Sequence, residues 1–186
     1  MITAIFGGSF DPPHIGHLLV MASVLHLGRA DEVLVVPCAA HPFGKVTAAF
    51  EDRLAMVRLL LQGELGGRAA ICDIERRRGL SGRTLDTVTA LRDEMPGRSL
   101  RLLVGADILA EKDRWYGFDR IEQITPLIVV GREGAPVPGL PAVSTASSTD
   151  IRARIRDGRD CSAMVAPRIL DYIAARGLYR CTSSIT

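Results

Sequence analysis

From Ile5 to His17 the chain reads IFGGSFDPPHIGH, and the apolar run Ile2–Phe6 at its start predicts a strand. The pair Gly7-Gly8 allows positive φ and a close approach of a ligand to the backbone. Asp11 precedes a proline and is therefore kept out of the α conformation, as an N-cap residue is. Pro12-Pro13 suits the start of a helix. This order of strand, turn and helix predicts free N–H groups and a positive helix end where an anion binds.

Two histidines, His14 and His17, stand at the predicted junction of turn and helix. Residues three apart on a helix face the same side. Gly16, between them, costs about 1 kcal/mol relative to alanine in a helix, which indicates the close approach of another group, such as a base or ribose. Two incidental surface histidines are the alternative reading, and a histidine pair with no Cys or third His nearby is a poor zinc site. The combination with the glycines and prolines favours a functional pair.

The composition is that of a globular protein, and we expect a single domain over residues 1–186, 47% hydrophobic and 24% charged. The net charge of +2 is too small for a general nucleic-acid binder. No apolar run reaches the length that spans a membrane. The four cysteines, Cys38, Cys72, Cys161 and Cys181, are scattered and predict free thiols in a reducing compartment, by default the cytoplasm.

Strand-like and helix-like segments alternate over residues 1–130. The predicted strands are Ile2–Phe6, Glu32–Pro37, Ala69–Ile74, Leu100–Val104 and Leu127–Val130. The predicted helices are His17–Leu27, a helix capped by Thr47 and continued by Phe50, Leu54, Val57 and Leu61, then Thr84–Met95, Thr149–Asp157 and Pro167–Arg176. The alternation predicts an α/β fold, a Rossmann-like doubly wound parallel sheet of about five strands with helices on both faces. A small C-terminal helical segment follows at residues 145–180.

Ligands of such sheets bind beyond the carboxyl ends of the strands. Several segments follow predicted strand ends: Gly7-Gly8, Pro37–Lys45, Ile74–Arg83, Gly105–Asp107 and the residues from Gly131 onward. Because parallel strands end at the same edge of a sheet, we expect these segments to share one rim.

A second signal lies in the C-terminal segment, where the chain reads SSTDIR from Ser147 to Arg152. Ser and Thr are preferred N-caps, so hydroxyls and free N–H groups gather at one helix start. Arg152 lies about one turn into that helix, from where its guanidinium reaches back to hold a polyphosphate by paired hydrogen bonds. An ordinary capped helix with a solvated arginine is the alternative.

The first run resembles the G-G-S/T-F-D-P-x-H-x-G-H motif of the nucleotidyltransferase superfamily, and its prolines and histidines look most like the bacterial nicotinate (or nicotinamide) mononucleotide adenylyltransferases. SSTDIR resembles the second motif of that superfamily, S-S-T-x-I-R, which holds the β- and γ-phosphates. The resemblance implies transfer of AMP from ATP to nicotinate mononucleotide, giving deamido-NAD and pyrophosphate. The ATP-binding residues that it implies are Gly7, Gly8, Ser9, Phe10, Gly16, Gly105, Asp107, Ser147, Ser148 and Thr149.

Lys45 lies in the loop after the second predicted strand, where relatives often read P-P-H-K and the lysine neutralises phosphate charge. This chain reads HPFGK from His41 to Lys45, a departure in register. A mobile surface lysine is the alternative reading. The resemblance implies four catalytic residues, His14, His17, Lys45 and Arg152.

Gly105, Asp107, Trp115 and Phe118 resemble the G-x-D-x-L…W-x-x-W stretch of the same family. There the aspartate helps to position the nucleotide and the first aromatic side chain stacks on the pyridine ring, as a flat heterocycle can on tryptophan. Trp115 is equally suited to anchor the core. Phe118 stands where a second tryptophan is common.

The segment Thr84-Leu85-Asp86-Thr87 resembles the T-x-D-T-L stretch whose backbone reads the pyridine carboxylate in the family. Thr84, Asp86 and Arg83 are therefore expected, with Trp115, to bind the acceptor. Arg83 stands where relatives often have tyrosine, and a cation there favours an acidic acceptor such as nicotinate mononucleotide.

The nucleophile of this reaction is a phosphate oxygen that is already anionic, so catalysis requires positioning and charge stabilisation rather than a general base. We expect Mg²⁺ to bridge the ATP phosphates through water and substrate, with no dedicated protein cage. The expected partners are ATP and nicotinate mononucleotide, without nucleic acid or membrane; the oligomeric state stays open, a homodimer included. The alternatives are a phosphopantetheine adenylyltransferase, a cytidylyltransferase, or a nucleotide-binding regulator without catalysis.

Overall fold

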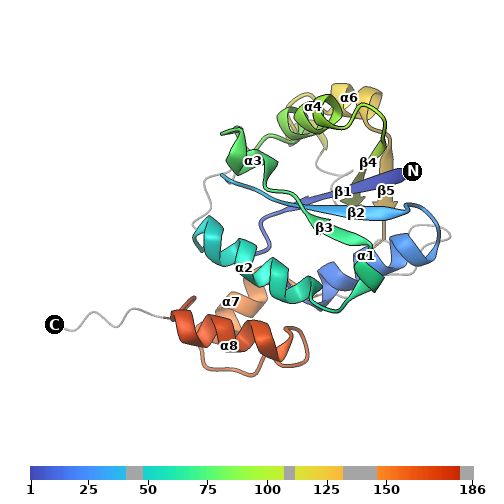
Figure 1. The fold of residues 1–186 in the computed structure, drawn as a ribbon. Helices are drawn as coiled ribbons and strands as arrows, with labels where there is room; N and C mark the ends of the chain where they lie inside the picture. Colours follow the sequence, from blue (N-terminus) through green and yellow to red (C-terminus); the bar gives the residue numbers. More distant parts are fainter. Residues whose placement is uncertain (41–47, 107–111, 132–145, 181–186) are drawn as a thin grey trace.

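Five parallel strands form the centre of the molecule (Figure 1), in the order β3-β2-β1-β4-β5. The computed structural model describes residues 1–40, 48–106, 112–131 and 146–180. The strands are β1 (Ile2–Gly8), β2 (Glu32–Pro37), β3 (Ala69–Ile71), β4 (Ser99–Gly105) and β5 (Leu127–Val130). Every pairing is parallel, so all the carboxyl ends lie on one edge.

Helices cover both faces of the sheet (Figure 1). On one face α1 (Ile15–His26) and α2 (Phe50–Leu61) pack against the strands, and α7 (Ser148–Arg156) and α8 (Pro167–Arg176) lie beyond them. On the other face are α3 (Ile74–Arg77), α4 (Thr84–Glu94) and α6 (Phe118–Ile124). Short 3-10 turns occur at Leu65–Gly67 and Lys112–Arg114.

The alternation of side chains along each strand divides the core in two. Ala4 joins the cluster under α1 and α2, whereas Ile5 joins the cluster under α4 and α6. Along β2, Val33 and Val35 take the first side and Leu34 takes the second. Strands buried on both faces read as continuous apolar runs, which is why these segments were recognisable from sequence.

The predicted fold class is confirmed, with most boundaries within two residues. One predicted boundary was wrong, and the helix α6 was not predicted. The third strand ends at Ile71, and the short helix α3 follows it, because a four-residue helix shows no usable periodicity. The N-cap of α2 is Ala49, and the expected cap, Thr47, lies outside the described residues.

The order of the strands fixes where a ligand binds. β1 is central, with β2 on one side and β4 on the other, so the chain reverses its direction of winding there. The crevice beyond the carboxyl ends at such a switch point is the usual ligand site of open α/β sheets. Gly8 pairs with Pro37 at the end of β2, and β4 continues to Gly105, which pairs with Val130 at the end of β5. None of the helices in the described part of the chain is long and apolar enough to cross a membrane.

Candidate functional site

The glycine turn lies at the end of the central strand. Gly7 and Gly8 are the last residues of β1, and the left-handed conformation falls on Phe10, whose φ is +50°. The expectation that the glycines supply positive φ is therefore wrong. A Cβ on Gly8 would lie 3.2 Å from the buried Phe10 ring, whereas a Cβ on Gly7 would meet nothing within 4 Å. Gly8 thus makes room for Phe10, and the backbone at Gly7 is open to a ligand.

The first helix begins later than the two prolines suggest. Its N-cap is His14, in extended conformation, and α1 starts at Ile15. Asp11, expected as an N-cap, is instead fully buried in the loop, and its bond to Pro12 is cis. The expectation that Asp11 is an N-cap was wrong, because its carboxylate accepts hydrogen bonds from Ala48 and Tyr179, which are distant in the sequence, and not from the first N–H groups of α1.

The two histidines lie against each other at the start of α1, with ring centroids 3.8 Å apart. The backbone N–H of His14 donates to Nδ1 of His17 at 3.1 Å. In the neutral His17 ring the proton is therefore on Nε2, which makes that nitrogen a hydrogen-bond donor. The Phe10 ring packs on His17 with centroids 4.9 Å apart and limits its rotation. His14 is 5% exposed and Gly16 is buried, while His17 is half-buried.

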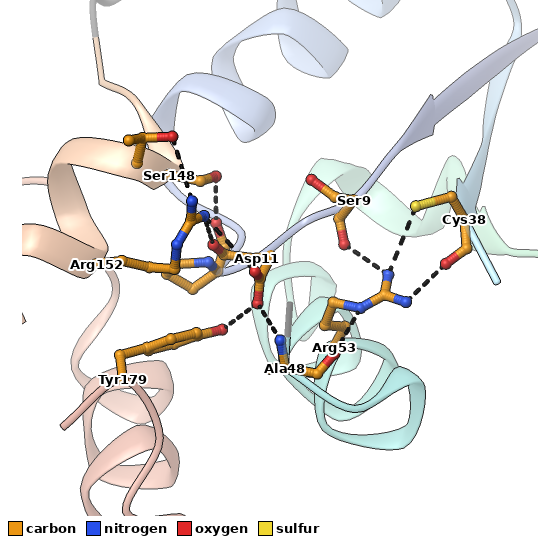
Figure 2. A network of polar contacts seen from close by, with 10 residues as sticks. Ser9, Asp11, Cys38, Ala48, Arg53, Ser148, Arg152 and Tyr179 are labelled. Carbon is orange, nitrogen blue, oxygen red and sulfur yellow. Dashed lines mark hydrogen bonds and ion pairs between the residues drawn. The ribbon is translucent and has the colours of Figure 1, made fainter. Parts of the chain in front are cut away.

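The start of α7 is docked onto this same loop (Figure 2). Ser147 is the N-cap, and the Ser148 hydroxyl donates to the carbonyl of Pro12 at 2.9 Å. Arg152 Nη1 donates to the carbonyl of Asp11 at 2.6 Å, and Arg152 Nη2 donates to the Thr149 hydroxyl at 3.3 Å. The structure thus brings together two segments that are 136 and more residues apart along the chain.

Arg53 braces the glycine loop and was not predicted from sequence. Its guanidinium donates to the carbonyls of Ser9 at 2.8 Å, Cys38 at 2.7 Å and Ala48 at 3.1 Å (Figure 2), and the residue is 2% exposed. It joins the loop after β1, the end of β2 and the start of α2. A signal existed, since Arg53 falls three residues after Phe50, on the inward face of α2.

A second buried group, Glu75, was also missed. One carboxylate oxygen accepts from the Thr87 hydroxyl at 2.7 Å and the other accepts from the backbone N–H of Ala39 at 2.8 Å. Burial raises the pKa of Glu75 above its usual value. This side chain links the segment after β2 to the first turn of α4. In the sequence it looks like one member of a charged surface run.

The expected acceptor-binding residues gather at the start of α4. Arg83 is the N-cap and Thr84 is the first helical residue, and the Asp86 carboxylate accepts from the Ser81 hydroxyl at 2.5 Å. Gly82, with φ of +78°, lies so close to the segment after β2 that a Cβ would be 2.3 Å from the carbonyl oxygen of Ala40. The turn before α4 is therefore pressed against the end of β2.

Trp115 lies beside the same turn. It is half-buried, packs on the core under α4 and meets Phe118 edge to face, with centroids 6.1 Å apart. A recess of about 450 Å³ is lined by Lys112, Asp113, Trp115, Gly117, Phe118 and Asp119. The exposed Tyr116 ring holds the Arg83 guanidinium 4.4 Å from its centroid. Trp115 thus contributes to the core and also borders a cavity.

Two of the predicted site residues, Lys45 and Asp107, lie outside the described residues, as does His41. Gly105 is the last residue of β4 and pairs with Val130 of β5. Within the described ranges, no three His, Cys, Asp or Glu side chains are grouped as a metal site requires. The rim thus has two parts: a more buried part with His14, His17 and Arg152, of which His14 is buried and the other two are half-buried, and a more exposed part with Arg83 and Trp115.

Comparisons with known proteins show the family of the chain. The family model described as "Cytidylyltransferase-like" matches residues 5–154. A protein from Anaeromyxobacter dehalogenans strain 2CP-1, named "Probable nicotinate-nucleotide adenylyltransferase", is 42% identical over 95% of this chain and 96% of its own length. A protein of the same name from Gemmatimonas aurantiaca is 40% identical over 97% of this chain and 93% of its own length.

A solved structure supports the fold. The Plasmodium falciparum nicotinic acid mononucleotide adenylyltransferase complexed with NaAD superimposes with a TM-score of 0.83, covering 96% of this chain and 97% of the other. Their sequences are only 20% identical, so the likeness concerns the fold.

Proposed function

This chain belongs to the cytidylyltransferase-like family, and we propose that it is the enzyme that transfers AMP from ATP to nicotinate mononucleotide, giving deamido-NAD and pyrophosphate. The resemblance to the nicotinate mononucleotide adenylyltransferases is confirmed by the named relatives. The observation that carries the proposal is the contact between the two phosphate motifs. Ser148 and Arg152 both donate to carbonyls of the loop that leads into His14.

The reaction is an in-line attack of the acceptor phosphate on the α-phosphorus of ATP. The attacking oxygen is anionic at neutral pH, so the protein has to position two substrates and stabilise charge on the phosphates. The site geometry suits this task, because its donors converge on one rim and no base is needed.

In this proposal His17 donates a hydrogen bond from Nε2 to the α-phosphate. The bond from the His14 N–H to Nδ1 selects the tautomer with that donor, and the Phe10 ring fixes its direction. His14 assists from the adjacent ring, and Lys45 adds a positive charge. The backbone at Gly7, Gly8, Ser9 and Phe10 cradles the phosphates; Phe10 contributes through its backbone, since its side chain is buried. Gly16 leaves room for the nucleoside, which Gly105 and Asp107 help to position.

The leaving pyrophosphate belongs at the start of α7. Ser147, Ser148 and Thr149 supply the first N–H groups and hydroxyls of that helix, where the dipole favours an anion. Arg152 supplies a planar pair of donors that matches a phosphate. Its present partners, the Asp11 carbonyl and the Thr149 hydroxyl, keep the guanidinium over the helix start.

The acceptor belongs on the other part of the rim. In this proposal Trp115 stacks on the pyridine ring, and the start of α4, with Thr84 and Asp86, meets its carboxylate side. Arg83, held by the Tyr116 ring, adds a positive charge there. This charge favours nicotinate mononucleotide over its amide.

A magnesium ion fits the proposal when the triphosphate carries it. In the buried Asp11 carboxylate Oδ1 already accepts from Ala48 and Tyr179, and Oδ2 lies 3.6 Å from the Arg152 guanidinium, so its charge faces Arg152 rather than a metal ion. Mg²⁺ would thus be held by phosphate oxygens and water, and when bound it neutralises charge on the phosphates. The same proposal places the enzyme in the cytoplasm and includes no nucleic-acid partner. It allows a homodimer, which a measurement of the molar mass in solution tests.

The test measures pyrophosphate release from ATP with nicotinate mononucleotide and with its amide, side by side. We expect rapid release with the acid and slower release with the amide. Phosphopantetheine and CTP serve as the substrates of the sister enzymes. Release with either of these, and none with the pyridine nucleotides, would refute the proposal. No release with any acceptor would favour a nucleotide-binding regulator.

A further inference from the structure

The Asp11 carboxylate is a buried junction that the proposed chemistry does not use. Asp11 is 0% exposed. Its Oδ1 accepts from the Tyr179 hydroxyl at 2.6 Å and from the backbone N–H of Ala48 at 3.1 Å. Asp11 lies in the loop between β1 and α1, residues 9–14, which we call the phosphate loop. Its Oδ1 atom thus contacts both Ala48, at the start of α2, and Tyr179, 168 positions later along the chain (Figure 2).

The backbone at Tyr179 indicates that this contact is specific. Its φ is +63°, a left-handed conformation that residues other than glycine seldom adopt. Such a conformation persists when the surrounding contacts stabilise it. Burial and the adjacent Asp11 carboxylate raise the pKa of Tyr179 far above its usual value, so the hydroxyl keeps its proton and donates.

Asp11 also faces Arg152. Arg152 Nη1 donates to the Asp11 carbonyl at 2.6 Å and lies 3.6 Å from Oδ2 of the same residue. Tyr179 and Arg152 therefore meet the same residue from two sides (Figure 2). Arg152 is therefore held by a residue that Tyr179 also contacts.

We propose that Tyr179 is a positioning residue for ATP. Its hydroxyl fixes the Asp11 carboxylate, and Asp11 in turn sets the Arg152 guanidinium and the phosphate loop in the geometry that takes the triphosphate. The end of the chain thereby contributes to ATP use without touching ATP. This inference rests on the proposed function for the role of Arg152.

Tyr172 provides a matched control. Its hydroxyl donates to Oδ1 of Asp52 at 2.9 Å. This is again a hydrogen bond from a tyrosine of the C-terminal segment to an aspartate carboxylate. Asp52 lies in α2, however, and not in the phosphate loop. Tyr172→Phe and Tyr179→Phe each remove one hydroxyl and keep the ring. A difference between their kinetic constants therefore comes from the contact with the phosphate loop and not from the mere loss of one hydrogen bond.

The experiment measures kcat and KM for ATP and for nicotinate mononucleotide, together with thermal unfolding, in both variants. We expect Tyr179→Phe to lower kcat/KM for ATP about tenfold and to leave KM for the acceptor within about twofold. Tyr172→Phe should keep all kinetic constants within about twofold of the original. In an Arg152→Ala background the effect of Tyr179→Phe should shrink to less than about twofold, because the two residues act in series.

Several outcomes would overturn the inference. If both tyrosine variants lose activity only in proportion to their loss of stability, Tyr179 is structural. An undiminished effect of Tyr179→Phe in the Arg152→Ala background would also exclude the route through Arg152. If Tyr179→Phe does not fold, Asp11→Asn, which keeps Oδ1 as an acceptor and removes the charge beside Arg152, must show the same ATP-specific loss. If the unsubstituted protein uses a different acceptor, the proposed function is wrong, but the role of Tyr179 is still tested. The two tyrosine variants are then compared with that acceptor.

Discussion

The two parts of the rim are built differently. Around the phosphate loop the key groups are buried, with Asp11 at 0%, Arg53 at 2% and His14 at 5% exposure. At the acceptor side the Arg83 guanidinium rests on Tyr116, which is 62% exposed. The first part is fixed by hydrogen bonds from distant segments. In the second part buried Glu75 and the packing of Gly82 on Ala40 hold the start of α4, whereas the Arg83 guanidinium is held at the surface by the Tyr116 ring.

This difference separates chemistry from selectivity. Donors that are held before the substrate arrives cost no reorganisation during the reaction, so charge on the phosphates is stabilised most effectively at the buried part. Under the proposed function the exposed part contacts the acceptor, so a substitution there leaves the donors of the buried part in place. Substitutions in the buried part should therefore reduce turnover, and those in the exposed part should change the choice of acceptor.

The largest effect is expected at His17. His17→Ala removes the donor at the α-phosphate and should lower kcat by about 10²- to 10³-fold, while the thermal unfolding midpoint changes little. His26→Ala, in the last turn of the same helix, is the control and should leave kcat unchanged. A stable His17→Ala enzyme with nearly full activity would remove this residue from the mechanism.

The next effect is expected at Arg152. Arg152→Lys keeps the charge but loses the planar pair of donors, so kcat/KM for ATP should fall by about 10- to 100-fold. The control is Arg154→Lys, since Arg154 pairs with Asp150 on the same helix and away from the loop. If both lysine variants behave alike in steady-state kinetics, the start of α7 does not hold the leaving group.

A smaller effect, on selectivity, is expected at Arg83. Arg83→Gln removes the positive charge beside the acceptor and should lower the preference for nicotinate over nicotinamide mononucleotide by about tenfold, with kcat for the acid little changed. Arg92→Gln, further along α4, is the control. An unchanged ratio of the two kcat/KM values would show that Arg83 does not read the acceptor.

Gly82, where the two parts of the rim meet, should affect turnover least, and its substitution should mainly affect stability. Gly82→Ala places a Cβ against the Ala40 carbonyl and strains a left-handed residue, so it should lower the free energy of unfolding by about 1–3 kcal/mol. Urea denaturation gives the value. Gly97→Ala, where nothing lies within 4 Å, should change it far less. If Gly82→Ala and Gly97→Ala had equal free energies of unfolding, the turn before α4 would not be packed tightly against the end of β2.

The sequence revealed the elements whose signals are local. The glycine turn, the SSTDIR helix start and the apolar strands each carry their pattern within a few residues, and all were located, although the third strand ends three residues earlier than predicted. The roles assigned to the individual site residues stay predictions, and Lys45 and Asp107 lie outside the described residues.

The sequence did not reveal contacts that depend on the assembled fold. Asp11 was read as an N-cap because it precedes prolines, yet its partner Tyr179 is 168 positions away. Arg53 and Glu75 were missed for the same reason. A charged side chain in a helix looks solvent-exposed until the strands and loops around it are in place.

The most direct test of the whole account is a crystal structure of this protein with a non-hydrolysable ATP analogue and Mg²⁺. The account predicts one triphosphate within hydrogen-bond distance of both the backbone at Gly7-Gly8 and the Ser148–Arg152 helix start, with His17 Nε2 at the α-phosphate. A triphosphate that touches only one of these two segments would contradict it.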